Sequence, residues 1–140
     1  KLKLYNMALF EWEPRYSVHI SEFDNDHKKL IELLQKLHQN MLDGQGKNIV
    51  GGILDELKEY TVYHFGAEEK LMEEYNYPLF EEHKAKHIEL IEQLDELIES
   101  YKKGESQIST ETYRFLNKWL TNHIMNADKK YTAFFKDKGL

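Results

Sequence analysis

Four long segments of the sequence carry apolar residues at helical spacing, and the breaks between them are short. The segments cover residues 21–43, 49–75, 78–103 and about 109–124. Within each, apolar side chains recur every three or four residues, which is the period of an amphipathic α-helix. Because short connections make consecutive helices antiparallel neighbours, the pattern predicts an all-α, antiparallel up-down-up-down four-helix bundle. No segment of useful length alternates apolar and polar residues, so a sheet is not expected.

Local signals predict where these helices begin and end. Ser21 stands three residues before Asp24, which is typical of a capping serine at a helix start. The Asp-Gly pair at 43–44 is typical of a helix end. Residues 76–78 (NYP) predict a turn, with Pro78 as the first residue of the third helix, because proline is tolerated at that position but not inside a helix.

Two further segments flank the four helices. Residues 7–20 lack a helical stripe and are expected to form an ordered arm that packs across the domain. A short C-terminal helix is expected around Tyr131, Phe134 and Phe135. The length of 140 residues suits one domain over 1–140 with a substantial core. Residues 1–6 precede Met7, where MALFEWEP reads as a natural start, and they are left out of the expected fold.

Composition excludes several classes of function. The chain has no cysteine, so any metal must be held by nitrogen and oxygen atoms. The net charge is −6, and lysines alternate with glutamates along the helices, so nucleic-acid binding is not expected. No run of 18 apolar residues exists and the N-terminus lacks the apolar core of a signal peptide. The expectation is a cytoplasmic monomer without membrane insertion.

Histidines occupy five positions on the apolar stripes, where core residues would be expected: His27, His64, His83, His87 and His123. Glu68 lies one helical turn after His64 on the same face. The helix ends nearest these residues all fall at one end of an up-down-up-down bundle, so at about 1.5 Å per residue the side chains lie within a slab roughly 10 Å thick. A lone buried histidine is more often a hydrogen-bonded core residue, and we keep that interpretation for His19 and His38.

This cluster favours a metal centre with two ions. His83 and His87 are four residues apart, which aims two imidazoles at one point. The HExxH pattern of zinc proteases and the Glu-x-x-His pairs of ferritin-like bundles are both absent. Five imidazoles exceed the needs of one tetrahedral zinc, whereas two metals bridged by carboxylates use them all. Glu68 is therefore predicted to be buried because it bridges the metals.

The position of Asp128 predicts a bridging role only under a condition. Asp128 follows His123 by five residues, and a regular α-helix would rotate the two side chains apart by about 140°. Either Asp128 is not a ligand, or the helix breaks between them within the IMNAD stretch.

Five motifs in order make the chain resemble the bacteriohemerythrins, the single-domain bacterial members of the hemerythrin family, over residues 10–136. The motifs are W-x3-YSV at 12–18, FDNDH ending at His27, HFGAEEKLM from His64, YPLFEEHKAKH ending at His87, and WLTNHIMNADKKY at 119–131. Myohemerythrin, a member of this family, is itself a standard example of an up-down-up-down four-helix bundle, so the expected fold and the resemblance are not independent.

The resemblance implies two iron ions joined by an oxo or hydroxo bridge and by two carboxylates. The implied metal ligands are His27, His64, Glu68, His83, His87, His123 and Asp128. One iron would take the last three histidines, and the other would take His27 and His64 and keep one position open for O2. The stripes and the resemblance together place Leu30, Phe65, Trp119 and Leu120 in the wall of the O2 pocket.

Reversible O2 binding for transport, delivery or storage is the leading hypothesis, and the expected partner besides O2 is an O2-consuming enzyme or a reductase. A non-enzymatic role is expected because no additional acid–base group is visible. The alternatives are a di-iron enzyme that reduces peroxide or nitric oxide, an O2 or redox sensor domain, and a metal-free structural bundle. Multiple-turnover assays with a reductant would distinguish the first of these.

Overall fold

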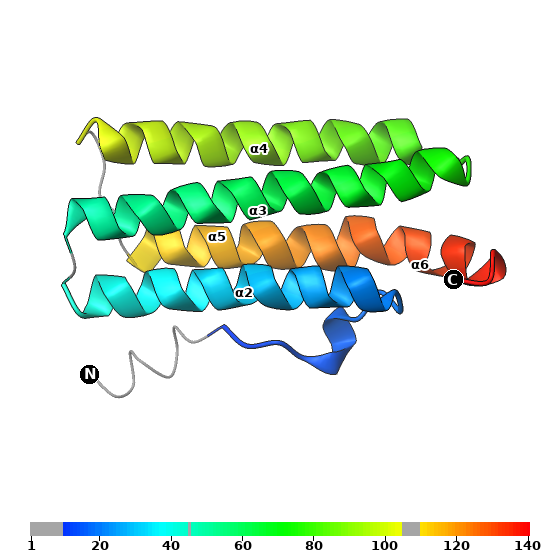
Figure 1. The fold of residues 1–140 in the computed structure, drawn as a ribbon, viewed down its shortest axis with the longest axis horizontal. Coiled ribbons are helices and arrows are strands. Elements are labelled where there is room, and N and C mark those ends of the chain that lie inside the picture. The colour runs from blue at the N-terminus through cyan, green and yellow to red at the C-terminus, as the bar shows by residue number, and fades with distance from the viewer. Residues whose placement is uncertain (1–9, 45, 105–109) are drawn as a thin grey trace.

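The structure is a computed structural model that describes residues 10–44, 46–104 and 110–140. Its four long helices are packed lengthwise against one another, and consecutive helices of the chain run in opposite directions (Figure 1). They are α2 (Ser21–Leu42), α3 (Lys47–Glu74), α4 (Phe80–Lys102) and α5 (Thr110–Asn122). A single 3-10 turn, η1 (Pro14–Tyr16), precedes them. The predicted all-α, up-down-up-down bundle is confirmed, and the described residues form no strand.

The fourth rod of the bundle is longer than a single α-helix. A π-helix, η2 (His123–Asp128), follows α5 directly, and α6 (Lys129–Asp137) follows η2. The three elements form one continuous rod that ends beyond the other helices (Figure 1). The predicted C-terminal helix is therefore present, as a continuation of the fourth helix.

The turn after α3 differs from the expectation at Pro78. Asn76 adopts the left-handed conformation with φ of 55°, and the Tyr77 N–H donates to the Met72 carbonyl oxygen at 2.8 Å. These are the features of a Schellman helix end, which satisfies carbonyls that the last turn would leave free. The Phe80 N–H then bonds the Tyr77 carbonyl across a turn that contains Pro78, so the helix begins at Phe80 and the prediction of Pro78 as its first residue is wrong.

The expected capping role of Ser21 is also wrong. Ile20 is the N-cap of α2, and no side chain caps this end of the helix. The Asp24 carboxylate instead accepts bonds from the Ser17 hydroxyl at 2.6 Å and from the Val18 N–H at 2.8 Å. Asp24 therefore ties the preceding arm to the first turn of α2, where a negative charge is also favoured by the helix dipole.

The predicted arm is present over residues 10–20, and its residues 7–9 lie outside the described part of the chain. Phe10 and Val18 are buried against the bundle. The Gln35 side-chain amide donates to the Phe10 carbonyl at 2.5 Å, and the Lys129 ammonium donates to the Ser17 carbonyl at 2.8 Å. The arm thus connects the first helix with the last one at the end of the bundle that holds most of the histidines.

The two remaining histidines do not belong to the group of histidines at that end. His38 is buried and stacks on Tyr113 with ring centroids 4.3 Å apart, as expected for a core residue. His19 is exposed on the arm.

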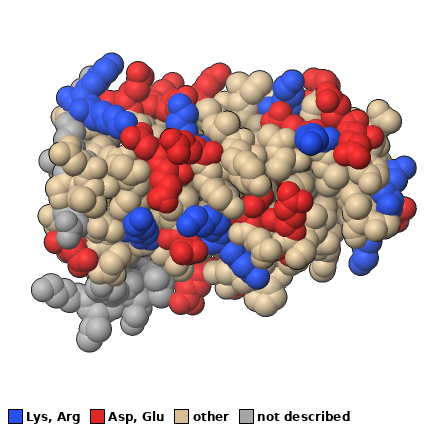
Figure 2. Space-filling view, in the orientation of Figure 1, with Lys and Arg blue, Asp and Glu red and all other residues tan. Residues whose placement is uncertain are grey.

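On the face shown in Figure 2, lysine side chains lie scattered among acidic ones, without a continuous basic surface. Among the described helices, none combines the length and the hydropathy needed to cross a membrane.

Candidate metal centre

Five histidines and two carboxylates meet inside the bundle where α2 begins and α3 ends. All seven side chains are between 0 and 6% exposed. They come from α2, α3, α4 and the π-helix η2: His27, His64, Glu68, His83, His87, His123 and Asp128. The convergence that the depth of these residues predicts is therefore present.

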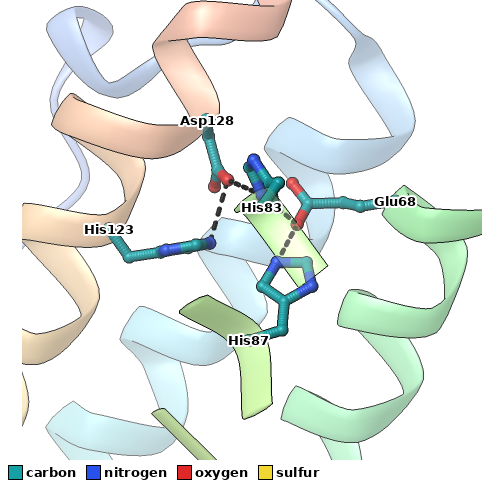
Figure 3. A group of neighbouring side chains, drawn as sticks. All are labelled: Glu68, His83, His87, His123 and Asp128. Atoms are coloured by element: carbon teal, nitrogen blue, oxygen red, sulfur yellow. Dashed lines mark ion pairs between the residues drawn. The ribbon is translucent and has the colours of Figure 1, made fainter. Parts of the chain in front are cut away.

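The cluster divides into two groups of possible ligands that share both carboxylates. One group combines the two carboxylates with His83, His87 and His123 (Figure 3). The other combines them with His27 and His64. Within each group the candidate ligand atoms lie within 4.8 Å of one another. Two atoms on opposite sides of an ion with bonds of about 2.1 Å are about 4.2 Å apart, so either group has the size of a metal site.

Asp128 directs its two oxygen atoms to different groups of histidines. Its Oδ1 lies 3.0 Å from Nε2 of His83 and 3.0 Å from Nε2 of His123. Its Oδ2 lies 3.1 Å from Nε2 of His27. A carboxylate placed in this way can serve two ions at once.

Glu68 divides its oxygen atoms in the same manner. Its Oε1 lies 3.1 Å from Nε2 of His87, and its Oε2 lies 3.4 Å from Nε2 of His64. The Nε2 atoms of His27 and His64 are themselves only 2.9 Å apart. The first group therefore offers three imidazoles and two carboxylate oxygens, and the second offers two of each.

The hydrogen bonding of the cluster fits a set of metal ligands. Nε2 of His83, His87 and His123 are buried, and their approaches of 3.0–3.1 Å to carboxylate oxygens do not have the geometry of hydrogen bonds. The same holds for Oε1 of Glu68 and for both oxygens of Asp128. Unsatisfied buried polar atoms destabilise a fold by about 1–3 kcal/mol each, so six at one point are not expected of a purely structural core. Their lone pairs suit a cation.

The charges of the cluster favour the same interpretation. Burial opposes ionisation of Glu68, yet the neighbouring imidazoles of His64, His83 and His87 hold its pKa well below the usual range. Burial also opposes protonation of His64 and His83, yet the carboxylates raise the pKa of His64 to about 10 and that of His83 to about 9. Without a metal, protons therefore balance the two buried carboxylates, and metal cations would take over that role.

The π-helix explains how Asp128 reaches the cluster. A π-helix closes its hydrogen bonds between residues five apart, so residues at that spacing lie one above the other. His123 and Asp128 are the first and last residues of η2. Asp128 therefore reaches the cluster because the helix widens into a π-helix between His123 and Asp128. The helix does not break there, although a break was the condition stated for Asp128 as a ligand.

Three side chains outside the predicted ligand set form hydrogen bonds or ion pairs with members of the cluster. The Asp26 carboxylate lies 2.8 Å from Nδ1 of His64. The Glu69 carboxylate lies 2.7 Å from Nδ1 of His87. Such partners fix the orientation and tautomer of a metal-binding imidazole. The available signal was that each acid directly adjoins a candidate ligand in the sequence, Asp26 before His27 and Glu69 after Glu68.

The third is Tyr131, whose fully buried hydroxyl donates to Oε2 of Glu68 at 2.5 Å. Burial and the adjacent Glu68 charge raise the pKa of Tyr131 well above its usual value, so the hydroxyl keeps its proton as a donor. Tyr131 lies eight residues after His123, on the rod that begins with α5.

The four residues predicted to wall the O2 pocket are all buried, with Leu30 at 0% and Leu120 at 3% exposure. Phe65 stacks on the His87 ring with centroids 3.8 Å apart and planes at 5°, whereas its centroid is 6.2 Å from that of His64. Its closest imidazole therefore belongs to the three-histidine group. Trp119 donates from its indole N–H to the Leu90 carbonyl at 3.2 Å.

Comparison with known proteins places this geometry in one family. The profile of the Hemerythrin HHE cation binding domain matches residues 18–135. A bacteriohemerythrin of Stenotrophomonas maltophilia is 38% identical over 89% of this chain and 80% of its own length. One of Methylococcus capsulatus is 34% identical over 89% of this chain and 95% of its own length. A crystal structure of wild-type hemerythrin superposes with a TM-score of 0.84 at 32% identity, over 89% of this chain and 96% of the other.

The matched region contains all seven residues of the cluster, and the matched fold is the four-helix bundle that positions them. The family description names cation binding, which agrees with the buried ligand set. This chain therefore belongs to the hemerythrin family.

Proposed function

We propose that the chain binds O2 reversibly at a centre of two iron ions held by the seven buried ligands. The observation that carries this proposal is the division of each carboxylate between two groups of histidines, which supports two ions bridged by Glu68 and Asp128. Family membership supports iron as the metal and O2 as the ligand, because the matched relatives are bacteriohemerythrins. A pair of ferrous ions would supply the electrons that allow O2 to bind and leave again.

The unequal number of imidazoles determines where O2 would bind. With the carboxylates and a bridging hydroxide or oxide shared equally, the ion held by His83, His87 and His123 has one more donor than the ion held by His27 and His64. We therefore assign the open position to the His27 and His64 side.

The other residues of the site would orient the metal ligands and exclude water from them. Asp26 and Glu69 would orient His64 and His87, and Tyr131 would orient Glu68. Leu30 and Leu120 would form an apolar wall that keeps water from the bound ligand, together with Phe65 and Trp119.

An absorption spectrum of the reduced protein before and after exposure to air, with iron counted on the same sample, tests the proposal. We expect two irons per chain and new absorption that disappears when O2 is removed. One zinc per chain with negligible iron, after growth with ample iron, would contradict the two-iron centre. Sustained consumption of peroxide or nitric oxide with a reductant would instead identify a di-iron enzyme.

The residues behind the imidazoles give a second prediction. We expect Glu69→Gln and Asp26→Asn to weaken iron binding by about 10–100-fold, because each loses the charged partner that orients a ligand imidazole. Competition with a chelator measures the loss. Glu73→Gln, which changes an exposed acid on the same helix, is the matched control and should bind iron like the wild type. Equal affinity in all three variants would show that these contacts do not support the centre.

A further inference from the structure

A groove between α4 and α5 lies beside the metal centre and shares Trp119 with the proposed wall of the O2 pocket. Its volume is about 520 Å³, within the range of about 300–1,000 Å³ that small-molecule sites occupy. Leu90 on α4 and Phe115 and Trp119 on α5 give it apolar surface, and the His123 imidazole also lines it. A molecule bound here would therefore lie against one of the candidate metal ligands.

The apolar part of the groove suits a flat ring system. The Trp119 indole is held in place by its hydrogen bond to the Leu90 carbonyl, which spans the two helices. Phe115 is 43% exposed, so its ring is accessible to a ligand in the groove. Aromatic rings favour stacked or edge-on contact with other rings, so this pair of side chains favours an aromatic ligand.

The groove is lined by more positive than negative side chains, although the whole chain is negatively charged. Lys86, Lys118 and Lys130 line it, although the whole chain carries a net charge of −6. None of the three forms an ion pair with any residue that the structure describes. The opposing charge in the groove is the carboxylate of Glu89. Three unpaired ammonium groups around an apolar floor favour a ligand that is both aromatic and anionic.

The lysines also indicate which end of the groove would hold the anionic group. Lys86 and Lys130 line a smaller adjoining hollow as well, next to His83 and Glu82. They therefore lie together at the end of the groove nearest this histidine, on α4 and α6, which is where we place the anionic group. Lys118 lies on α5, beside Trp119.

We propose that this groove binds an organic anion with a flat aromatic body, with its ring against Phe115 and Trp119 and its phosphate or carboxylate between Lys86 and Lys130. The groove lies against His123, whereas we assign the O2 position to the His27 and His64 side; the two sites share Trp119. The proposal does not depend on which metal the centre holds, so its failure would leave the O2 proposal untouched.

Flavin mononucleotide and riboflavin form a matched pair of probes, because they share one ring system and differ in the phosphate. Equilibrium dialysis against the metal-loaded protein, with flavin fluorescence as the readout, gives both dissociation constants. We expect flavin mononucleotide to bind at least tenfold more tightly than riboflavin at low salt, with the difference shrinking as salt is raised. Iron content and absorption spectrum are recorded for every variant, so that a damaged metal centre is recognised.

Variants of exposed residues test each part of the site. Lys86→Gln combined with Lys130→Gln should weaken binding of flavin mononucleotide about tenfold and leave riboflavin unchanged, and Glu89→Gln should tighten the former. Phe115→Ala should weaken both probes. Lys70→Gln, which lies outside this groove, should change neither.

Three results would overturn the proposal. They are equal affinity for the two probes, unchanged affinity in the double lysine variant, and dissociation constants above about 1 mM for both probes.

Discussion

Glu68→Ala is expected to abolish stable binding of both irons. Glu68 is fully buried, and its two oxygens face different groups of histidines, so its removal takes one bridging ligand from each ion. It also removes the negative charge that balances the metal cations in a site without solvent. We expect fewer than half the wild-type irons to remain after dialysis against a chelator. Iron analysis and the loss of visible absorption measure the effect.

Glu69→Ala is the informative control for this experiment. Glu69 is the next residue along the helix, and its alanine variant loses a carboxylate of the same size. This carboxylate contacts Nδ1 of His87, on the side of the ring away from the cluster. The Glu69→Ala variant should bind iron about 10–100-fold more weakly than the wild type and should still lose clearly less iron than Glu68→Ala under the same dialysis. Far-ultraviolet circular dichroism should show the same helix content in both. Iron losses of similar size in the two variants would mean that Glu68 does not bridge the ions.

Leu120→Ser is expected to keep both irons and to shorten the lifetime of the oxygenated protein by at least tenfold. Leu120 is 3% exposed and lies one helical turn before His123, in the proposed apolar wall. A hydroxyl in that wall admits water and protons, which favour irreversible oxidation of the centre over release of O2. The decay of the oxygenated absorption at a fixed temperature measures the lifetime, and iron is counted on the same sample.

A second buried leucine controls for simple destabilisation. Leu37 is fully buried on α2, ten residues after His27 and therefore about 15 Å along the helix. Leu37→Ser should lose several kcal/mol of stability, as large-to-small core substitutions do, without shortening the lifetime of the oxygenated protein. An unchanged lifetime in Leu120→Ser at unchanged iron content would show that this leucine does not line the O2 position.

The sequence predicted the bundle and the location of the site because both depend on periodicity. The apolar stripes fix which face of each helix is buried, and His27 and Glu68 lie on those stripes. Helix ends were less predictable, because backbone geometry decides them. Asn76 in the left-handed conformation ends α3 and delays the next helix past Pro78, and Asp24 binds the arm where Ser21 was expected to cap.

Contacts across helices account for what periodicity missed in the site. Which imidazole a surface acid reaches depends on the rotation and spacing of two helices, so the partnership of Glu69 with His87 has no signature within either segment. Sequence adjacency was also misleading for Phe65, which follows His64 directly but stacks on His87. The role of Asp128 required the π-helix, whose presence no propensity scale predicts for HIMNAD.

The π-helix can also be understood as one surplus residue in an otherwise regular helix. Deleting a single residue between His123 and Asp128 would leave them four apart, which is the one-turn spacing of an α-helix, so the two side chains would again share a face. Tyr131 and Phe135, both fully buried, would keep their own relation to Asp128. A chain one residue shorter within this stretch is therefore expected to keep the histidine and the aspartate on one face, with a regular α-helix in place of the π-helix.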